Sequence, residues 1–245
     1  GISGIGEATF WAQPAATAEV VHSFKEYLIG KDPLTIDRHW LYLYRSSSFR
    51  GASVGAALSA IDVALWDIAG KHYGAPVHGL LGGRHRERVR MCALTMADDQ
   101  ETVMAMVTDA VREGHTAVKI DPLPSAYPGW SRAHLLREVV ERVGAVREAV
   151  GEDVDVCVEL HRKLGPAEAV ALAAKLEPFD LLYIEDPIPP DSIASMAEVA
   201  RKVNIPIATG GRLHPVYEFK EVLESQAAED LKLDVGLHGG ITQCK

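Results

Sequence analysis

Three short apolar segments of this sequence end in polar side chains at regular intervals. They are VDVCVELH, LLYIEDP and IPIATGG, all within residues 154–211. Glu185 follows Glu159 by 26 residues, and Gly211 follows Glu185 by another 26. Because a strand, a helix and two loops need about this length, the spacing predicts successive parallel βα units whose strand ends meet at one site. Two carboxylates are therefore expected at that site, with a glycine where a third would stand.

Carboxylates that converge from loops suit Mg²⁺, which commonly takes a few of them together with water and substrate oxygens. The candidate metal ligands are Glu159, Glu185 and Asp186. His161 follows Glu159 by two residues, so in an extended strand both side chains face the same way. One of the two side chains could hold the metal while the other faces the substrate. The alternatives are a structural histidine and, for each single acid, a helix cap or an ion pair with arginine.

Two further strand ends carry groups that could act on a substrate. Lys119, in AVKID, is a candidate base or a cation that binds a carboxylate, and its alternative is a surface lysine. Asp121 shares its face. Asp234 ends the run DLKLDV, and the GGIT segment after it could offer backbone amides to an anion at a helix start.

Composition limits the functional classes. With 245 residues, 47% of them hydrophobic, the chain can bury a large α/β core. A net charge of −9 argues against nucleic acid and anionic membrane surfaces as partners. The three cysteines lack metal-binding spacing, which indicates a reducing compartment, and cytoplasmic localisation is expected. Cys92 and Cys157 lie in apolar strand patterns and are predicted to be small buried hydrophobes.

The chain divides into two predicted domains. Residues 1–84 carry three helical patterns, at 14–28, 34–47 and 51–72, and are expected to form a partial α+β capping domain with its linker. Asp62 and Asp67 interrupt the apolar part of the third pattern before it reaches membrane-spanning length. Residues 85–245 alternate six short apolar runs with helical patterns, which predicts a partial (β/α) barrel of the TIM type rather than a doubly wound sheet.

At this point the motifs resemble a known family. GIGEA at residues 4–8 is similar to a strand of its capping domain, SAIDVALWDIAGKHYGAPVHGLLGG to the helix and linker before its barrel, and YIEDP to its fourth barrel strand. The chain resembles the mandelate racemase/muconate lactonizing enzyme family of the enolase superfamily, and within it the sugar-acid dehydratases of the galactonate and gluconate type. In that family the fold is a modified (β/α)7β barrel with an α+β cap.

The resemblance implies Mg²⁺-dependent dehydration of an aldonate to a 2-keto-3-deoxy acid, through loss of the α-proton. His161 would be the general acid, Lys119 a second catalytic residue, and Asp234 the partner of a histidine on a seventh strand that is not in this sequence. The implied substrate contacts are Asp121, Arg212, Tyr127 and Trp130, the last two of which could instead only pack.

The sequence departs from the family pattern at the metal site. Glu159 stands where the family usually has Asp, and Gly211 where it has the third ligand, Glu. A racemase, a cycloisomerase or a non-catalytic relative therefore remain as alternatives. Six strands also fall short of the eight that close a barrel, so we expect either a partial sequence, or closure by a homo-oligomer or by a rearrangement.

Overall fold

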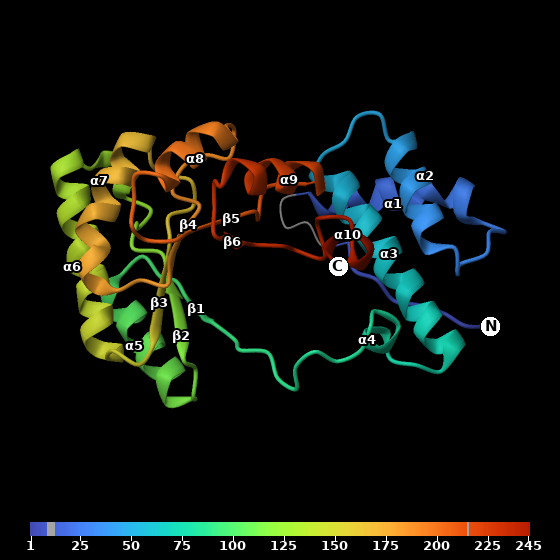
Figure 1. Cartoon of the computed structure of the whole chain (residues 1–245), viewed down its shortest axis with the longest axis horizontal. Coiled ribbons are helices and arrows are strands. Elements are labelled where there is room, and N and C mark those ends of the chain that lie inside the picture. The colour runs from blue at the N-terminus through green and yellow to red at the C-terminus, as the bar shows by residue number, and fades with distance from the viewer. Residues whose placement is uncertain (9–12, 215) are drawn as a thin grey trace. The chain divides into compact units, whose positions relative to one another are not determined.

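A computed structural model describes residues 1–8, 13–214 and 216–245. The chain divides into two compact units (Figure 1). The first, here called the helical unit, contains residues 1–87, 211–219 and 233–245. The second, here called the sheet unit, contains residues 88–210 and 220–232. The chain thus returns to the helical unit twice after entering the sheet unit, and the predicted division at residue 84 stays a prediction.

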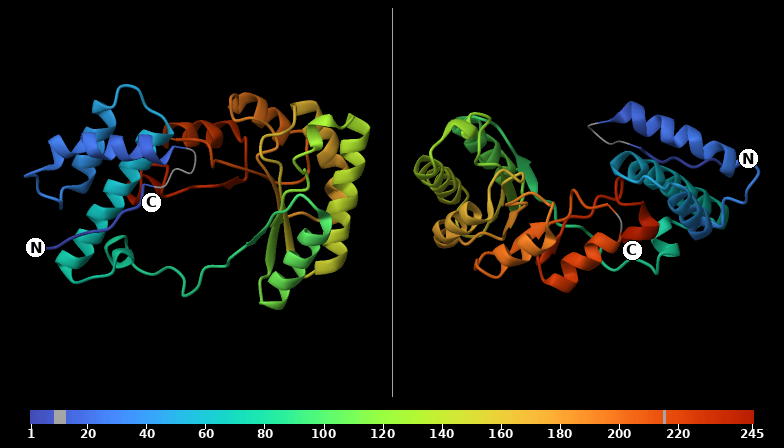
Figure 2. Two further views of the ribbon diagram at one scale, coloured as in Figure 1. Left: turned by 180° about the vertical axis from the view of Figure 1, so that it is seen from behind. Right: turned by 90° about the horizontal axis from the view of Figure 1, so that it is seen from above.

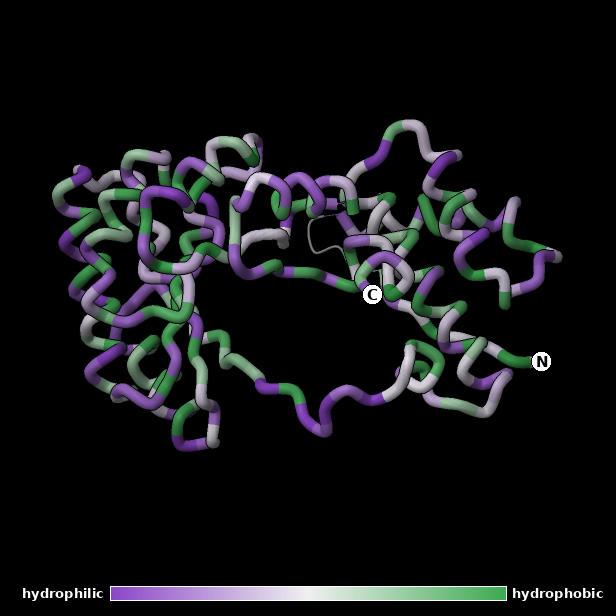
Figure 3. The backbone as a smooth tube through the Cα atoms, in the orientation of Figure 1, coloured by the Kyte–Doolittle hydropathy of each residue, from purple (hydrophilic) through white to green (hydrophobic). Residues whose placement is uncertain are grey.

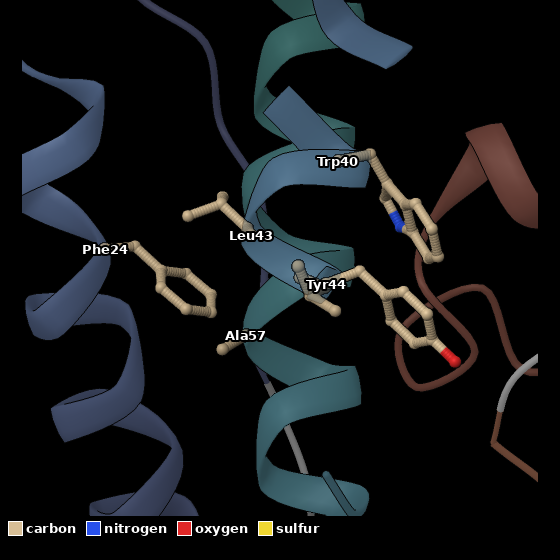
Figure 4. Close-up of a cluster of buried hydrophobic side chains, with 6 residues drawn as sticks. Phe24, Trp40, Leu43, Tyr44 and Ala57 are labelled. Atoms are coloured by element: carbon tan, nitrogen blue, oxygen red, sulfur yellow. The ribbon is translucent and has the colours of Figure 1, made fainter. Parts of the chain in front are cut away.

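The helical unit is built from an antiparallel arrangement of long helices and two short ones. Its helices are α1 (Pro14–Leu28), α2 (Ile36–Ser46), α3 (Ala52–Tyr73), α4 (Val77–Leu80) and α10 (Ile241–Cys244). Phe24, Leu43 and Ala57, one from each long helix, meet in a buried apolar cluster (Figure 4). Trp40 and Tyr44 stack on each other, with ring centroids 4.7 Å apart, and extend this cluster. Both aromatic side chains are buried.

The central helix of this unit, α3, touches α1, α2, α4 and α10. Gly55 allows the close approach expected from its lack of a side chain, because an added Cβ would lie 2.5 Å from the Leu237 carbonyl oxygen. The helix ends at Gly74, whose φ of 61° is the left-handed conformation that suits glycine.

By length and composition alone, α3 could cross a membrane. Its most apolar window has a mean hydropathy of 1.4, and 44% of that window is buried inside the protein. The prediction that Asp62 and Asp67 keep the apolar stretch below membrane-spanning length is therefore wrong. Both aspartates instead serve packing within the unit: Asp62 accepts a hydrogen bond from the Thr242 backbone N–H, and Asp67 accepts one from that of Ile5.

The sheet unit contains one sheet of six parallel strands in sequential order. The strands are β1 (Ala93–Thr95), β2 (Ala117–Ile120), β3 (Asp155–Glu159), β4 (Tyr183–Glu185), β5 (Ile207–Thr209) and β6 (Asp230–Leu231). Sequential order with helical crossovers is the arrangement of a (β/α) barrel, so the predicted fold class is confirmed for the strands that this chain holds.

Helices connect these strands. They are α5 (Gln100–Arg112), α6 (Arg132–Val150), α7 (Pro166–Leu176), α8 (Ile193–Ala200) and α9 (Val216–Ser225), with 3₁₀ turns at Tyr127–Gly129 and Glu177–Phe179. Figure 2 shows α5, α6 and α7 side by side along one face of the strands. In Figure 3 these helices alternate between hydrophilic and hydrophobic residues, as amphipathic helices do when one face covers a sheet.

Two predictions about local structure are wrong. Residues 4–8, expected to be a strand, are not in a strand; they lie against α3, where a Cβ on Gly4 or Gly6 would collide with the carbonyls of Ala64 and Ala60. Cys92 is exposed because β1 begins only at Ala93 and has a neighbouring strand on one side alone. Cys157, in the middle of β3, is fully buried as expected.

Candidate active site

The parallel register of the strands brings two glutamates together. Glu159 and Glu185 are directly opposite each other at the ends of β3 and β4, and both are buried. The Lys119 Nζ, from the neighbouring strand β2, lies 2.8 Å from Glu185 Oε2 and 3.3 Å from Glu159 Oε2. One ammonium group thus serves two carboxylates, and the three predicted residues form one cluster.

The close approach of these charges changes their proton affinities. Burial, aided by the charge of Glu185, raises the pKa of Glu159 to about 7. Burial alone would lower the pKa of Lys119, but its bonds to Glu185 and the charges of both glutamates raise it above the ordinary value. A cation beside Glu159 therefore favours the loss of its proton.

A second set of contacts fixes His161. The Asp121 Oδ2 lies 2.7 Å from the Nδ1 of His161 and 2.7 Å from the Nζ of Lys163. Since a carboxylate accepts hydrogen bonds, the Nδ1 of His161 carries a hydrogen, and the Nε2 atom is left for a reacting group. Burial would raise the pKa of Asp121, but the bonds from His161 and Lys163 hold it below its usual range.

The turn after β3 explains how His161 reaches Glu159. His161 and Arg162 have φ values of 48° and 63°, in the left-handed region that side chains other than glycine rarely adopt. The extended-strand argument therefore does not apply to His161. In this turn the backbone N–H of His161 donates to Glu159 Oε1 at 2.9 Å, which holds the carboxylate at the strand end. Such conformations cost of order 1–3 kcal/mol each and are common where side chains must be aimed at a ligand.

The third predicted ligand is engaged elsewhere. Asp186 Oδ1 accepts a hydrogen bond from the hydroxyl of Thr209 at 2.6 Å, and its Oδ2 lies 3.7 Å from Nη1 of Arg162. Its φ of 44° is again left-handed. To bind a metal, Asp186 would have to exchange these partners for the ion.

Within the residues that the structure describes, no group of three or more acidic, histidine or cysteine side chains is arranged to hold a metal ion. The Glu159–Glu185 pair nevertheless has the chemistry of a cation site, because its carboxylates are buried, adjacent and bridged by a positive charge. Mg²⁺ is often held by one or two carboxylates together with water and substrate oxygens. The donor set therefore fits such an ion with two protein ligands.

The other predicted residues are distributed around these elements. Tyr127 packs under the ammonium of Lys163, at 5.5 Å from its ring centre, and Trp130 contacts the ring of His134 edge-on. Gly211 and Arg212 follow β5 by two and three residues along the chain and belong to the helical unit. Asp234 also belongs to that unit, and its Oδ1 accepts a hydrogen bond from the Gly236 backbone N–H.

The expected anion site at GGIT is not available. The helix that follows, α10, spans only four residues, and its Thr242 N–H already donates to Asp62 Oδ2 at 3.0 Å. A carboxylate of α3 therefore occupies the place that an anion was predicted to take.

Sequence reasoning missed Lys163 and Thr209. Lys163 belongs to the run His161-Arg162-Lys163, and this basic stretch directly after a strand end was a usable signal. Thr209 ends β5 in the apolar run IPIATGG, where a hydroxyl facing Asp186 gives no sequence signal.

A sheet of consecutive parallel βα units joined to a helical unit is the arrangement of an enolase-type fold. Residues 102–245 match the family described as enolase C-terminal domain-like. Residues 1–82 match the N-terminal domain of mandelate racemase/muconate lactonizing enzyme. The chain belongs to this family, and the resemblance in its motifs is confirmed.

Individual relatives are similar over the whole chain. A D-galactonate dehydratase of Variovorax paradoxus is 35% identical over 100% of this chain and 64% of its own length. The solved structure of an enolase superfamily member from Salmonella Typhimurium is 30% identical, with a TM-score of 0.91, and covers 100% of this chain and 69% of its own. An enolase from Agrobacterium radiobacter, solved with sodium and L-malate, is 29% identical, with a TM-score of 0.93 and coverages of 100% and 63%. The chain thus spans about 64% of the dehydratase it matches.

Proposed function

We propose that the protein to which this chain belongs dehydrates a sugar acid, an aldonate, to a 2-keto-3-deoxy acid with the help of Mg²⁺. The observation that carries the proposal is the pairing of two functional groups at adjacent strand ends. Glu159 and Glu185 form a buried two-carboxylate cluster, and the Asp121–His161 pair adjoins it through the His161–Glu159 hydrogen bond. Relatives named D-galactonate dehydratase support the same reaction class.

Each residue has a defined part in this chemistry. Glu159 and Glu185 would hold the ion, with Asp186 as a third ligand if it leaves Thr209. When bound, Mg²⁺ supplies positive charge to the substrate carboxylate and so makes the α-proton easier to remove. Lys119 adds a second positive charge at the same place.

The hydroxyl group on the β-carbon leaves as water, taking a proton from Nε2 of His161 while Asp121 steadies the ring through Nδ1. The α-proton goes to a base, and the resulting enol becomes the 2-keto group. By family resemblance that base is a histidine of a seventh strand, oriented by Asp234. Arg212, Tyr127 and Trp130 are proposed substrate contacts.

A second candidate, a relative with impaired catalysis, is favoured by one observation. Gly211 offers no ligand, and the described residues form no three-ligand group. A racemase or cycloisomerase has less support, because the second strand carries Lys119-Ile120-Asp121 and thus lacks a second lysine as base.

Product analysis separates these functions. The chain is incubated with a panel of aldonic acids, with and without Mg²⁺, and 2-keto-3-deoxy acids are assayed. Mg²⁺-dependent product supports dehydration. Exchange of the α-proton with solvent deuterium without product indicates a racemase or cycloisomerase, and neither signal indicates a non-catalytic relative.

The missing ligand can be restored. A Cβ at Gly211 would meet no atom within 4 Å, so Gly211→Glu can be accommodated. We expect Gly211→Glu to tighten Mg²⁺ binding, measured by calorimetric titration, by about tenfold or more, since it adds a charged ligand. Gly129→Glu, at another open glycine, is the matched control. Equal affinities of the two variants would show that residue 211 does not reach the metal site.

We also propose that the protein works in the cytoplasm as a homo-oligomer. The cysteine usage supports the compartment, and the net charge of −9 argues against nucleic acid and anionic membrane surfaces as partners. Small carboxylates are the expected partners, with neither nucleic acid nor membrane. Light scattering of the purified protein tests the oligomer, and a monomer at all concentrations would contradict it.

A further inference from the structure

The helical unit contains a cavity that the proposed reaction does not use. Its volume is about 210 Å³, and every residue that lines it belongs to that unit. The polar side chains of the wall are Arg50, His214, Glu218 and His238. Apolar wall comes from Trp40, Tyr44, Val54 and Leu58. A single water needs roughly 10–15 Å³ of such space, so the cavity has room for a small organic molecule.

His238 lines this cavity and has a buried ring nitrogen without a hydrogen bond of good geometry. The side chain is 2% exposed, and its Nδ1 accepts a hydrogen bond from the backbone N–H of Asp234 at 2.8 Å. Because Nδ1 is an acceptor, the hydrogen of the neutral ring is on Nε2. Burial lowers the pKa of His238 to about 4, which keeps the ring neutral. Among the described residues the buried Nε2 makes no hydrogen bond of good geometry, although the Leu213 backbone acts on the ring as a weak acceptor.

Arg50 is another polar residue of the wall. Arg50 donates from Nη1 to the Tyr44 hydroxyl at 2.7 Å and from Nε to the Ser47 carbonyl at 3.1 Å. Its guanidinium lies 4.1 Å from the centre of the Tyr44 ring. Nη2 makes no hydrogen bond within the described part of the chain, so it can donate to a ligand anion.

Two further lining residues contact each other: Glu218 Oε2 accepts a hydrogen bond from the His214 backbone N–H at 2.9 Å, and the buried Nδ1 of His214 has no partner in the described residues. The wall thus combines one cation, one carboxylate and two neutral imidazoles with an apolar surface.

We propose that this cavity binds a small hydroxylated carboxylate. The carboxylate of the ligand accepts hydrogen bonds from Arg50 and from Nε2 of His238, and a hydroxyl donates to Glu218. Its carbon chain lies against the aromatic and aliphatic wall. The inference stands on the helical unit alone and does not depend on the proposed function of the strand-end cluster.

Gluconate is the probe, titrated into the full chain and followed by the ¹H and ¹⁵N signals of the His238 imidazole and the Gly239 amide. Two control compounds show which groups of the probe are needed: sorbitol has hydroxyls without a carboxylate, and hexanoate has a carboxylate without hydroxyls. We expect gluconate to shift the His238 signals, and both control compounds to bind about tenfold more weakly or not at all. Equal binding of hexanoate, or no shift with gluconate, would overturn the proposal.

Two substitutions at residue 238 form a matched pair. His238→Asn keeps an acceptor near the Nδ1 position and removes the Nε2 donor, whereas His238→Gln places an amide donor near the Nε2 position. Binding should fall about tenfold in His238→Asn and less in His238→Gln, with circular dichroism as the check on folding. Equal affinity of His238→Asn and the unchanged chain contradicts the proposal.

Arg50→Gln, at an exposed residue, gives an independent test and is expected to weaken gluconate binding by a similar factor. Glu185→Gln separates this site from the strand-end cluster. In Glu185→Gln, gluconate should still shift the Gly239 amide signal as it does in the unchanged chain, even if binding at the strand-end cluster is lost. Loss of this shift would overturn the assignment to the cavity.

Discussion

The strand-end cluster of the sheet unit and the cavity of the helical unit both bury polar side chains, but they treat charge in opposite ways. In the cluster every buried carboxylate has a cation or a donor within reach, as Lys119 shows for Glu159 and Glu185. In the cavity the imidazoles of His214 and His238 are neutral, and each has one buried nitrogen without a hydrogen bond of good geometry in the described residues. Compensated charge suits a cation and proton transfer, whereas unmatched neutral donors suit a ligand that brings its own acceptor.

The strongest test of this contrast removes the shared cation. Lys119→Met leaves Glu159 and Glu185 buried without a positive partner, and we expect the free energy of unfolding to fall by about 3–5 kcal/mol. Urea denaturation at pH 8 measures it. Millimolar Mg²⁺ should recover part of the loss, because the ion would bind the same carboxylates.

The control is Lys71→Met, which breaks a solvent-exposed pair with Asp67 and should lower the free energy of unfolding far less. Similar losses in the two variants would show that the cluster gains nothing from burial of its charges.

The two regions should also respond to pH with opposite signs. The pKa of Glu159 is raised from 4.5 to about 7, so its contribution to stability is complete below pH 4.5 and is lost as the pH rises through 7. The pKa of His238 is lowered from 6.5 to about 4, so its contribution is complete above pH 6.5 and is lost as the pH falls through 4. Each shift corresponds to roughly 3 kcal/mol, and in the unchanged chain they largely cancel.

A substitution at Glu159 or at His238 should remove one of the two pH-dependent contributions and leave the other. Between pH 4.5 and 7.5, Glu159→Gln should make the free energy of unfolding rise with pH more steeply than in the unchanged chain. His238→Asn should make it fall. Urea denaturation at both pH values gives the two differences, expected to be about 3 kcal/mol and opposite in sign. Differences of the same sign would contradict the assignment of the charges.

The sequence predicted the cluster better than the cavity for a physical reason. Parallel strands place their carboxyl ends at one edge, so the equal spacing of Glu159 and Glu185 was enough to bring them together. No such periodic rule relates His238, on the short segment before α10, to Arg50 on the loop before α3. These two residues line the same cavity because of how the helices pack, and the spacing of residues in a single sequence does not predict that packing. Cys92 was mispredicted for a similar reason, because an apolar pattern does not show that β1 has a neighbour on one side only.

The prediction with the smallest effect tests whether the stability of the helical unit comes from close packing, in contrast to the charge interactions of the strand-end cluster. Gly55→Ala places a methyl group 2.5 Å from the Leu237 carbonyl oxygen, and the resulting shift of the backbone should cost about 1–3 kcal/mol. Gly51, the residue before α3, has open space around its Cβ position, so Gly51→Ser should gain a few tenths of a kcal/mol as a helix cap. Thermal unfolding of both variants measures the difference. Because no charge is involved, the loss in Gly55→Ala should be the same in low and high salt; a loss that changes with salt would mean that electrostatic contacts, and not close packing, hold α3 against this segment.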